Sequence, residues 1–201
     1  MRALLATCLA FSVMVACAPG PTEHERVIAL RAPAGPAQLL YAPVGTRIVM
    51  LNEINGSPTE STITVDRAEG IFGAFLDGNR RPGAYLPGCW GCSGDSEIEA
   101  ERYARLWPLV PGNAVSFVRA SPSGQVAEVS IRVAGRAKVE TVLGAFDTYI
   151  LDGRIEHVNG PRYSAQLRSW WAPGLGWVIK TTGGDSRGNT VESQIVDFSH
   201  P

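Results

Sequence analysis

Two cysteines separated by two residues, Cys89 and Cys92 in the run Cys-Trp-Gly-Cys, carry the most evident chemistry in the sequence. Such a pair forms either a structural disulfide or a redox-active dithiol. A redox-active pair sits at a helix N-terminus, where the helix dipole lowers the thiol pKa. The helix expected downstream begins about four residues after Cys92, beyond most of that effect. We predict a disulfide that braces a loop, with redox activity as the alternative.

The same cysteines do not make a metal or haem site. A structural zinc site needs four ligands, but the chain has no second cysteine pair, because Cys8 is expected to leave with a signal peptide and Cys17 to be lipidated. The remaining candidate ligands are the histidines His24, His157 and His200. A c-type haem requires His directly after the second cysteine, and residue 93 is Ser. We therefore predict no metal and no cofactor.

A hydrolytic site is not evident either. Asp147, His157 and a serine have the composition of a catalytic triad, but the sequence contains no Gly-x-Ser-x-Gly nucleophile turn. We assign no catalytic residue and expect a protein that is not an enzyme.

Three tryptophans, Trp170, Trp171 and Trp177, flank the turn sequence Ala-Pro-Gly-Leu-Gly at residues 172–176. The glycines of this turn permit positive φ angles. We predict a structural corner with tryptophans in the core. The alternative is an aromatic binding surface for a glycan or an apolar ligand.

The N-terminal segment decides the compartment. Arg2 precedes an apolar run over residues 3–15, shorter than the roughly 20 residues of a transmembrane helix and typical of a secretory signal. The run ends in Met14-Val15-Ala16-Cys17, which resembles the lipobox of bacterial lipoproteins. We predict cleavage before Cys17 and its lipidation by acyl chains such as palmitate. The alternative is a cut near Ala18 that releases a free protein.

The expected location is the cell envelope. By resemblance to the sorting rule of Gram-negative lipoproteins, Ala18 in place of Asp favours the outer membrane, at its periplasmic face. The 18 basic and 19 acidic residues leave no basic excess that would attract nucleic acid. The expected partner is therefore the membrane, through the lipid anchor, with a lipid, peptide or glycan as the candidate ligand.

The chain divides into three segments. Residues 1–16 are the predicted lipoprotein signal peptide, and residues 17–43 are the lipidated N-terminus and a tether rich in proline, which removes hydrogen-bond donors. Residues 44–201 form a single β-rich domain. Residues 77–95 within it are expected to form a long irregular loop, because they are rich in Gly and Pro.

Short β-forming segments fill this domain. In residues 125–134, Ala127, Val129, Ile131 and Val133 alternate with polar residues, which predicts a strand with one buried and one wet face. Gly135 separates it from the next expected strand. Asp152-Gly153 is either a hairpin turn or a bulge in one strand over 146–158, and we favour the bulge. One helix is expected after the capping box Ser96–Glu99 and before Pro108.

Three motifs in the second half of the chain carry a family resemblance. They are Leu-Trp-Pro-Leu-x-x-Gly at 106–112, Gly-x-Phe-Asp-x-Tyr at 144–149 and Trp-Trp-Ala-Pro-Gly-Leu-Gly-Trp-Val-x-Lys at 170–180. Together they resemble a family of bacterial exported β-domain lipoproteins, the TapB-like proteins. The resemblance implies a curved antiparallel sheet and no catalytic residues.

These observations predict a mainly β fold: a curved antiparallel sheet or partly open β-barrel with one short helix, preceded by the signal peptide and the Pro-rich tether. The leading hypothesis for function is an envelope lipoprotein with a non-enzymatic binding or scaffolding β domain. The alternatives are a periplasmic thiol–disulfide protein using Cys89 and Cys92, and a structural component of an envelope assembly.

Overall fold

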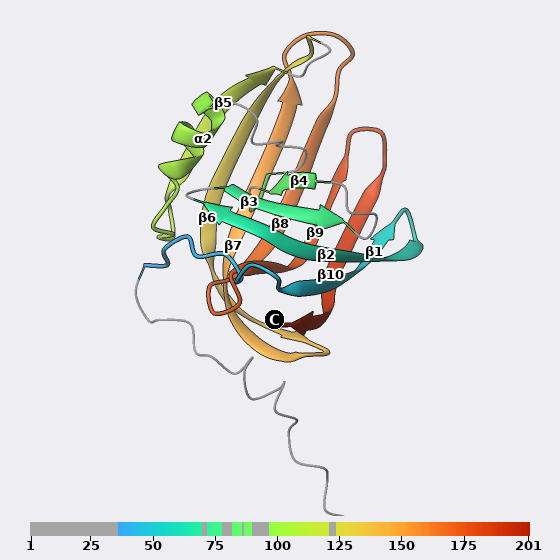
Figure 1. Cartoon of the computed structure of the whole chain (residues 1–201). Helices are drawn as coiled ribbons and strands as arrows, with labels where there is room; N and C mark the ends of the chain where they lie inside the picture. Colours follow the sequence, from blue (N-terminus) through green and yellow to red (C-terminus); the bar gives the residue numbers. More distant parts are fainter. Residues whose placement is uncertain (1–35, 70–71, 78–81, 86, 90–96, 121–123) are drawn as a thin grey trace, which may run out of the picture.

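The computed structural model describes residues 36–69, 72–77, 82–85, 87–89, 97–120 and 124–201 (Figure 1). Within these ranges the chain forms ten strands and one helix. The strands are β1 (Arg47–Ile54), β2 (Ser57–Glu69), β3 (Phe72–Asp77), β4 (Pro82–Tyr85), β5 (Ala114–Ala120), β6 (Val126–Thr141), β7 (Gly144–His157), β8 (Ser164–Ala172), β9 (Trp177–Asp185) and β10 (Thr190–Ser199), and the helix is α2 (Glu97–Ala104).

All ten strands belong to one antiparallel sheet with the order β4-β3-β2-β1-β10-β9-β8-β7-β6-β5. The two end strands of this order, β4 and β5, do not pair with each other in the described ranges, so the sheet stays open. Figure 1 shows the sheet bent so that β1–β4 cross in front of β6–β9. The predicted fold class, a curved open antiparallel sheet with one short helix, is confirmed.

Extra residues in the strands account for part of this curvature. The pairing shifts by one residue at Asp66 of β2, Ala134 of β6, Ile179 of β9 and Val196 of β10. A β-bulge of this kind bends its strand and increases the local twist. The sequence analysis predicted that a strand ends at Gly135, and this prediction is wrong. The bulge at Ala134 shifts the pairing by one residue, and β6 continues through Gly135.

Two predictions about loops need correction. Residues 144–157 form one continuous strand, as favoured, but the strand has no bulge at Asp152-Gly153: both residues pair in register with β6 and β8. The loop predicted over 77–95 contains β4, which pairs with β3. Its Pro-Gly start reads as a loop in the sequence, yet proline is tolerated at the first residue of an edge strand.

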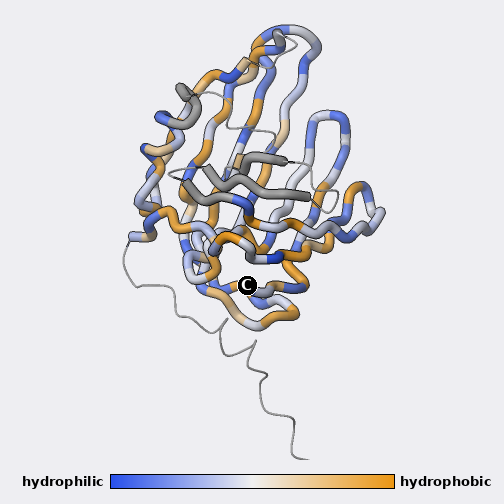
Figure 2. The backbone as a smooth tube through the Cα atoms, in the orientation of Figure 1, coloured by the Kyte–Doolittle hydropathy of each residue, from blue (hydrophilic) through white to orange (hydrophobic). Residues whose placement is uncertain are grey.

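Alternation of residue type along the strands places the core. Figure 2 shows hydrophobic and hydrophilic residues alternating along β6, β7 and β8. Val129, Ile131 and Val133 are at most 1% exposed, as the alternation predicted. One apolar cluster joins the inner face of β5–β8 to Tyr103, Leu106 and Leu109. A second cluster lies between β1, β10 and the turn after β8.

The helix covers one end of the sheet. α2 contacts β5, and the Tyr103 hydroxyl donates a hydrogen bond to the Pro87 carbonyl oxygen at 2.7 Å. The peptide bond Trp107–Pro108 is cis, and the helix ends before it. The predicted N-cap, Ser96, lies outside the described residues.

The segment just before β1 packs on the sheet. Ala37 exchanges two backbone hydrogen bonds with Leu109, at 3.4 and 2.8 Å, and the Ala42 N–H donates to the Gly176 carbonyl oxygen at 3.1 Å. Both alanines are 1% exposed. Residues 37–42, which the sequence analysis assigned to the tether, therefore contact the body of the domain.

Candidate functional site

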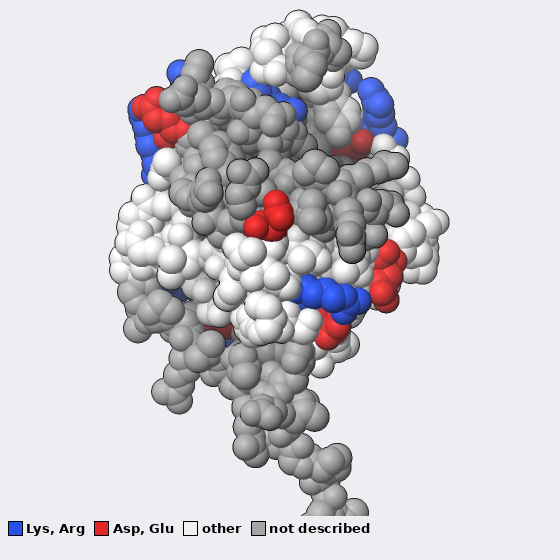
Figure 3. Space-filling view, viewed as in Figure 1, with Lys and Arg blue, Asp and Glu red and all other residues white. Residues whose placement is uncertain are grey.

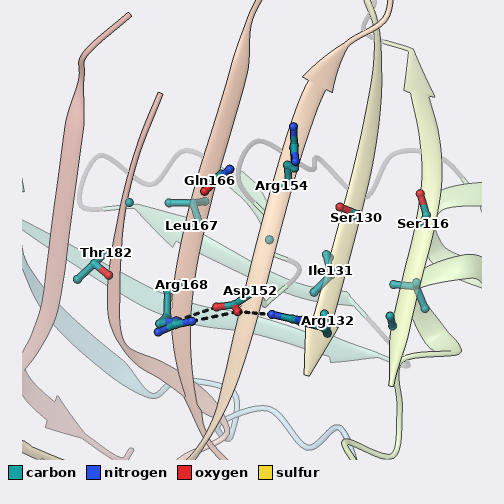
Figure 4. Close-up of a pocket in the computed structure, with 14 residues that line it drawn as sticks. Ser116, Ser130, Ile131, Arg132, Asp152, Arg154, Gln166, Leu167, Arg168 and Thr182 are labelled. Carbon is teal, nitrogen blue, oxygen red and sulfur yellow. Dashed lines mark hydrogen bonds and ion pairs between the residues drawn. The ribbon is translucent and has the colours of Figure 1, made fainter. Parts of the chain in front are cut away.

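An open hollow of about 840 Å³ crosses β5, β6, β7, β8 and β9. Figure 4 shows it from the side opposite to the view of Figure 1, on the face of these strands that is turned away from β1–β4. We call it the outer groove, and define it by the polar side chains that line it: Ser116, Ser130, Arg132, Asp152, Arg154, Gln166, Arg168 and Thr182.

Strand register places these side chains in two rows. One row runs Ala114, Arg132, Asp152, Arg168 and Thr182 across β5 to β9, and the next runs Ser116, Ser130, Arg154, Gln166 and Gly184. The residues at the ends of the rows are small and leave a hollow above the sheet, and the long arginine side chains form its walls. The small residues are Ala114, Ser116, Thr182 and Gly184. The groove therefore follows from side-chain size on one face of an otherwise regular sheet.

Three charged side chains from neighbouring strands meet in the first row. Arg168 donates two hydrogen bonds to the Asp152 carboxylate, from Nε to Oδ1 at 2.7 Å and from Nη2 to Oδ2 at 3.0 Å. Arg132 donates from Nη2 to Oδ2 at 3.1 Å. The carboxylate side chain is 24% exposed, against 63% for Arg132 and 50% for Arg168, so it lies deeper than either guanidinium.

These contacts change the acidity of the groups. The hydrogen bond from Arg168 lowers the pKa of Asp152, partial burial opposes that effect, and Arg132 adds to the lowering. The same hydrogen bond raises the pKa of Arg168. The row is therefore held in its charged form at neutral pH.

The carboxylate of Asp152 should make stability depend on pH. Because its pKa is lowered on folding, its contribution is present above the unfolded value of about 3.9 and is lost as pH falls through the folded pKa. We expect Asp152→Asn to reduce the free energy of unfolding by about 1 kcal/mol at pH 7, since the pair is partly exposed. Denaturant titrations of both proteins should converge at low pH. A difference that stays constant down to the lowest pH at which both fold would contradict this.

The remaining charges near the groove are paired. Arg154 contacts Glu156, and Ser116 donates a hydrogen bond to Glu128 at 3.2 Å. On the other side of the first row, Lys180 pairs with Glu192 at 2.9 Å and lies 5.9 Å from the Trp170 ring centroid. On the face shown in Figure 3, the acidic and basic side chains of the described residues are scattered among uncharged ones.

The structure places the predicted tryptophans in two settings. Trp171 and Trp177 are buried, at 0% and 3% exposure, while Trp170 is half-buried. Trp171 packs edge-on against Tyr41 and Trp107, at centroid distances of 5.8 and 5.7 Å. Two of the three tryptophans therefore lie in the core, and only Trp170 has part of its ring at the surface.

The other predicted site residues lie partly outside the described ranges. Cys89 is disulfide-bonded and 8% exposed, and Cys92, its predicted partner, lies outside the described residues, as does Cys17. His157 is at the end of β7, where its Nδ1 lies 2.8 Å from Gln125 Nε2 and its ring stacks on Tyr163. Asp147 lies on the same strand ten residues before His157, roughly 33 Å away along an extended chain, so the two side chains do not belong to one triad.

Two absences hold for the described part of the chain. It contains no group of three His, Cys, Asp or Glu side chains arranged to hold a metal ion. It also contains no helix of the length and hydropathy needed to span a membrane.

The sequence analysis missed Arg132, Asp152 and Arg168. The polar positions of the alternating pattern did assign Arg132 to a wet face. The three residues are 20 and 16 positions apart, however, and only the pairing register of β6, β7 and β8 brings them together. That register is set by the hydrophobic pattern and by the geometry of the turns that join the strands, and the turn signals in the sequence did not define it to the residue.

Comparison with known proteins gives distant similarities to solved structures. No protein-family model matches the chain, and no curated protein matches it. Among solved structures, it is similar to the hypothetical lipoprotein YmcC from Escherichia coli, at 11% identity and a TM-score of 0.46, covering 80% of this chain and 90% of that one.

Two further structures give similar values. An exported protein from Bacteroides fragilis, described as having a YmcC-like fold, shows 14% identity and a TM-score of 0.49, covering 82% of this chain and 100% of the other. A protein from Parabacteroides distasonis, described as a lipoprotein, shows 10% identity and a TM-score of 0.49 with the same coverages. Likenesses at this level do not determine function, and the TapB-like resemblance stays a prediction.

Proposed function

We propose that the chain is a lipid-anchored protein of the bacterial cell envelope whose β domain binds a ligand in the outer groove without catalysing a reaction. The observation that carries this proposal is the groove itself, a polar hollow across five strands with an ordered row of charges. Binding sites are typically concave and combine apolar surface with a few placed polar groups.

The anchor is proposed from the sequence. Met14-Val15-Ala16-Cys17 resembles a lipobox, and Ala18 favours the outer membrane and its periplasmic face. Among the described residues, Ala37 is the first that is buried. The residues between Cys17 and Ala37 can span at most about 70 Å, which is enough to hold the domain away from a lipid surface and leave the groove accessible.

The thiol–disulfide alternative has less support. Cys89 is buried and already disulfide-bonded, whereas reactive cysteines are partly exposed and electropositive in their surroundings. A structural role in an envelope assembly remains an alternative outcome of the experiment below.

Photocrosslinking in living cells tests binding at the groove. A benzophenone amino acid is placed at Ser116 or Thr182, at opposite ends of the groove, and for comparison at Glu60, an exposed residue of β2. We expect light-dependent adducts of the same mass at both groove positions and none at Glu60. Adducts at all three positions alike, or at none, would contradict a groove-specific ligand.

The anchor is tested in the same cells. Radioactive palmitate should label the unaltered chain and leave Cys17→Ser unlabelled, because the variant lacks the thiol to which the lipid is attached. Two acyl chains should also keep the unaltered chain in the membrane fraction. Absence of label from both proteins would reduce the proposal to a secreted binding protein.

A further inference from the structure

We propose that the outer groove recognises a negatively charged group, a carboxylate or a phosphate, through the guanidinium groups of Arg132 and Arg168, which Asp152 holds in position. The inference rests on the proposed binding function and names the chemistry of its ligand.

Arg132 and Arg168 have more hydrogen-bond donors than Asp152 can accept from. A guanidinium carries five N–H donors in a planar fork, and this fork matches the oxygen atoms of carboxylate and phosphate. Asp152 accepts two hydrogen bonds from Arg168 and one from Arg132. No other partner of these two guanidinium groups is found in the described part of the chain. Most of their donors are therefore left for a ligand.

Positive charge in the groove is concentrated at Arg132 and Arg168. Arg154 faces Glu156, and Lys180 faces Glu192, so each of these cations has its own carboxylate. Arg132 and Arg168, in contrast, share the single carboxylate of Asp152. The excess positive charge of the groove is thus confined to this row. Glu128 and Glu156 pair with each other four residues further along β6 and β7, which limits where an anion can sit.

The guanidinium groups of Arg132 and Arg168 are held in place before a ligand binds. The Asp152 carboxylate lies deeper than both arginine heads and receives three hydrogen bonds between 2.7 and 3.1 Å. Arginine side chains otherwise lose rotamer freedom on binding. Because Asp152 already orders the heads, less ordering remains to oppose binding. Asp152 is a positioning residue in this account, and the arginines contact the ligand.

Nuclear magnetic resonance on the full chain in neutral detergent micelles tests the proposal. The Nε–H signals of the arginine side chains are followed during titration with inorganic phosphate and, separately, with an oligomer of galacturonic acid. We expect the signals of Arg132 and Arg168 to shift, and Arg132→Gln to weaken binding about tenfold or more, the effect of one charge-assisted contact. Added salt should weaken binding further.

Arg47→Gln is the matched control. Arg47 also pairs with an aspartate, Asp197, at 2.8 Å, and its side chain is 47% exposed, but it lies in β1 and does not line the groove. This variant should bind the anions with an affinity within about twofold of that of the unaltered chain. A general effect of lost surface charge would instead weaken binding equally in Arg47→Gln and Arg132→Gln.

Flotation with vesicles separates two sources of the charged group. The lipidation-deficient Cys17→Ser chain is mixed with vesicles of phosphatidylglycerol or of phosphatidylcholine. The same assay is repeated with the chain that carries both Cys17→Ser and Arg132→Gln. Binding to phosphatidylglycerol that requires Arg132 would assign the anion to a lipid headgroup; otherwise it belongs to a soluble ligand. The proposal is overturned if no anion shifts the arginine signals, or if Arg132→Gln and Arg47→Gln behave alike. Groove-specific adducts at Ser116 and Thr182 would still support the binding function in that case.

Discussion

Replacing Gly153 with alanine is expected to lower the free energy of unfolding by about 2–4 kcal/mol, the range of severe overpacking. A Cβ atom at this position would lie 2.3 Å from the Gly88 carbonyl oxygen. That neighbour is backbone and cannot rotate away. The strand and the loop of residues 87–89 must therefore separate. Urea unfolding gives the stability, and faster exchange of the Gly88 and Cys89 amide hydrogens would locate the change.

Gly135→Ala is the control for the Gly153 variant. Gly135 lies in β6, a Cβ there meets nothing within 4 Å, and its φ is not among the positive values. Removing a glycine from a strand interior without strain should raise stability slightly, by roughly 0.5–1 kcal/mol. Equal losses at the two positions would show that Gly153 is needed for some reason other than its contact with Gly88.

The role of Gly153 illustrates what the sequence could predict. One continuous strand through Asp152 and Gly153 was the favoured prediction, and it was confirmed. The explanation offered, a bulge, was wrong, since Gly153 pairs regularly with Ile131 and Leu167. The glycine is required by a loop about 65 residues earlier in the chain, and local patterns carry no information on such a contact.

Local patterns were most informative where one face of a strand is buried. The alternation of Ala127, Val129, Ile131 and Val133 predicted both the strand and its inner face, because the side-chain period of a strand is two residues. The same rule fails at a bulge, where the period slips by one. Ala134 is such a position, and the break predicted at Gly135 is absent.

The candidate site was beyond local prediction for a related reason. Arg132, Asp152 and Arg168 meet because β6, β7 and β8 are paired in one particular register. A shift of one residue would turn each side chain to the other face. The cysteine pair and the tryptophan cluster were the candidate redox and binding motifs of the sequence. Three of their residues, Trp171, Trp177 and Cys89, are buried.

Replacing Trp171 with alanine should have the largest effect of the substitutions considered, about 3–5 kcal/mol of lost stability. Its ring is 0% exposed and packs edge-on against Tyr41 and Trp107. Tyr41 belongs to the segment before β1, and Trp107 follows α2. Trp171 thus joins both to the sheet, so its removal leaves a cavity where three parts of the chain meet. Thermal and urea unfolding would measure the loss.

Two variants separate this explanation from a general requirement for tryptophan. Trp170→Ala, next along the same strand but half-buried, should cost markedly less, since part of its ring already contacts solvent. Trp171→Phe should recover much of the loss, because the buried Trp171 indole N–H has no hydrogen-bond partner among the described residues. Phenylalanine keeps an aromatic ring and removes that unsatisfied donor. If Trp171→Phe were as unstable as Trp171→Ala, the N–H would have a partner that the packing does not reveal. If Trp170→Ala lowered the stability more than Trp171→Ala, the half-buried Trp170 ring and its contact with Lys180 would contribute more to stability than the buried Trp171 ring.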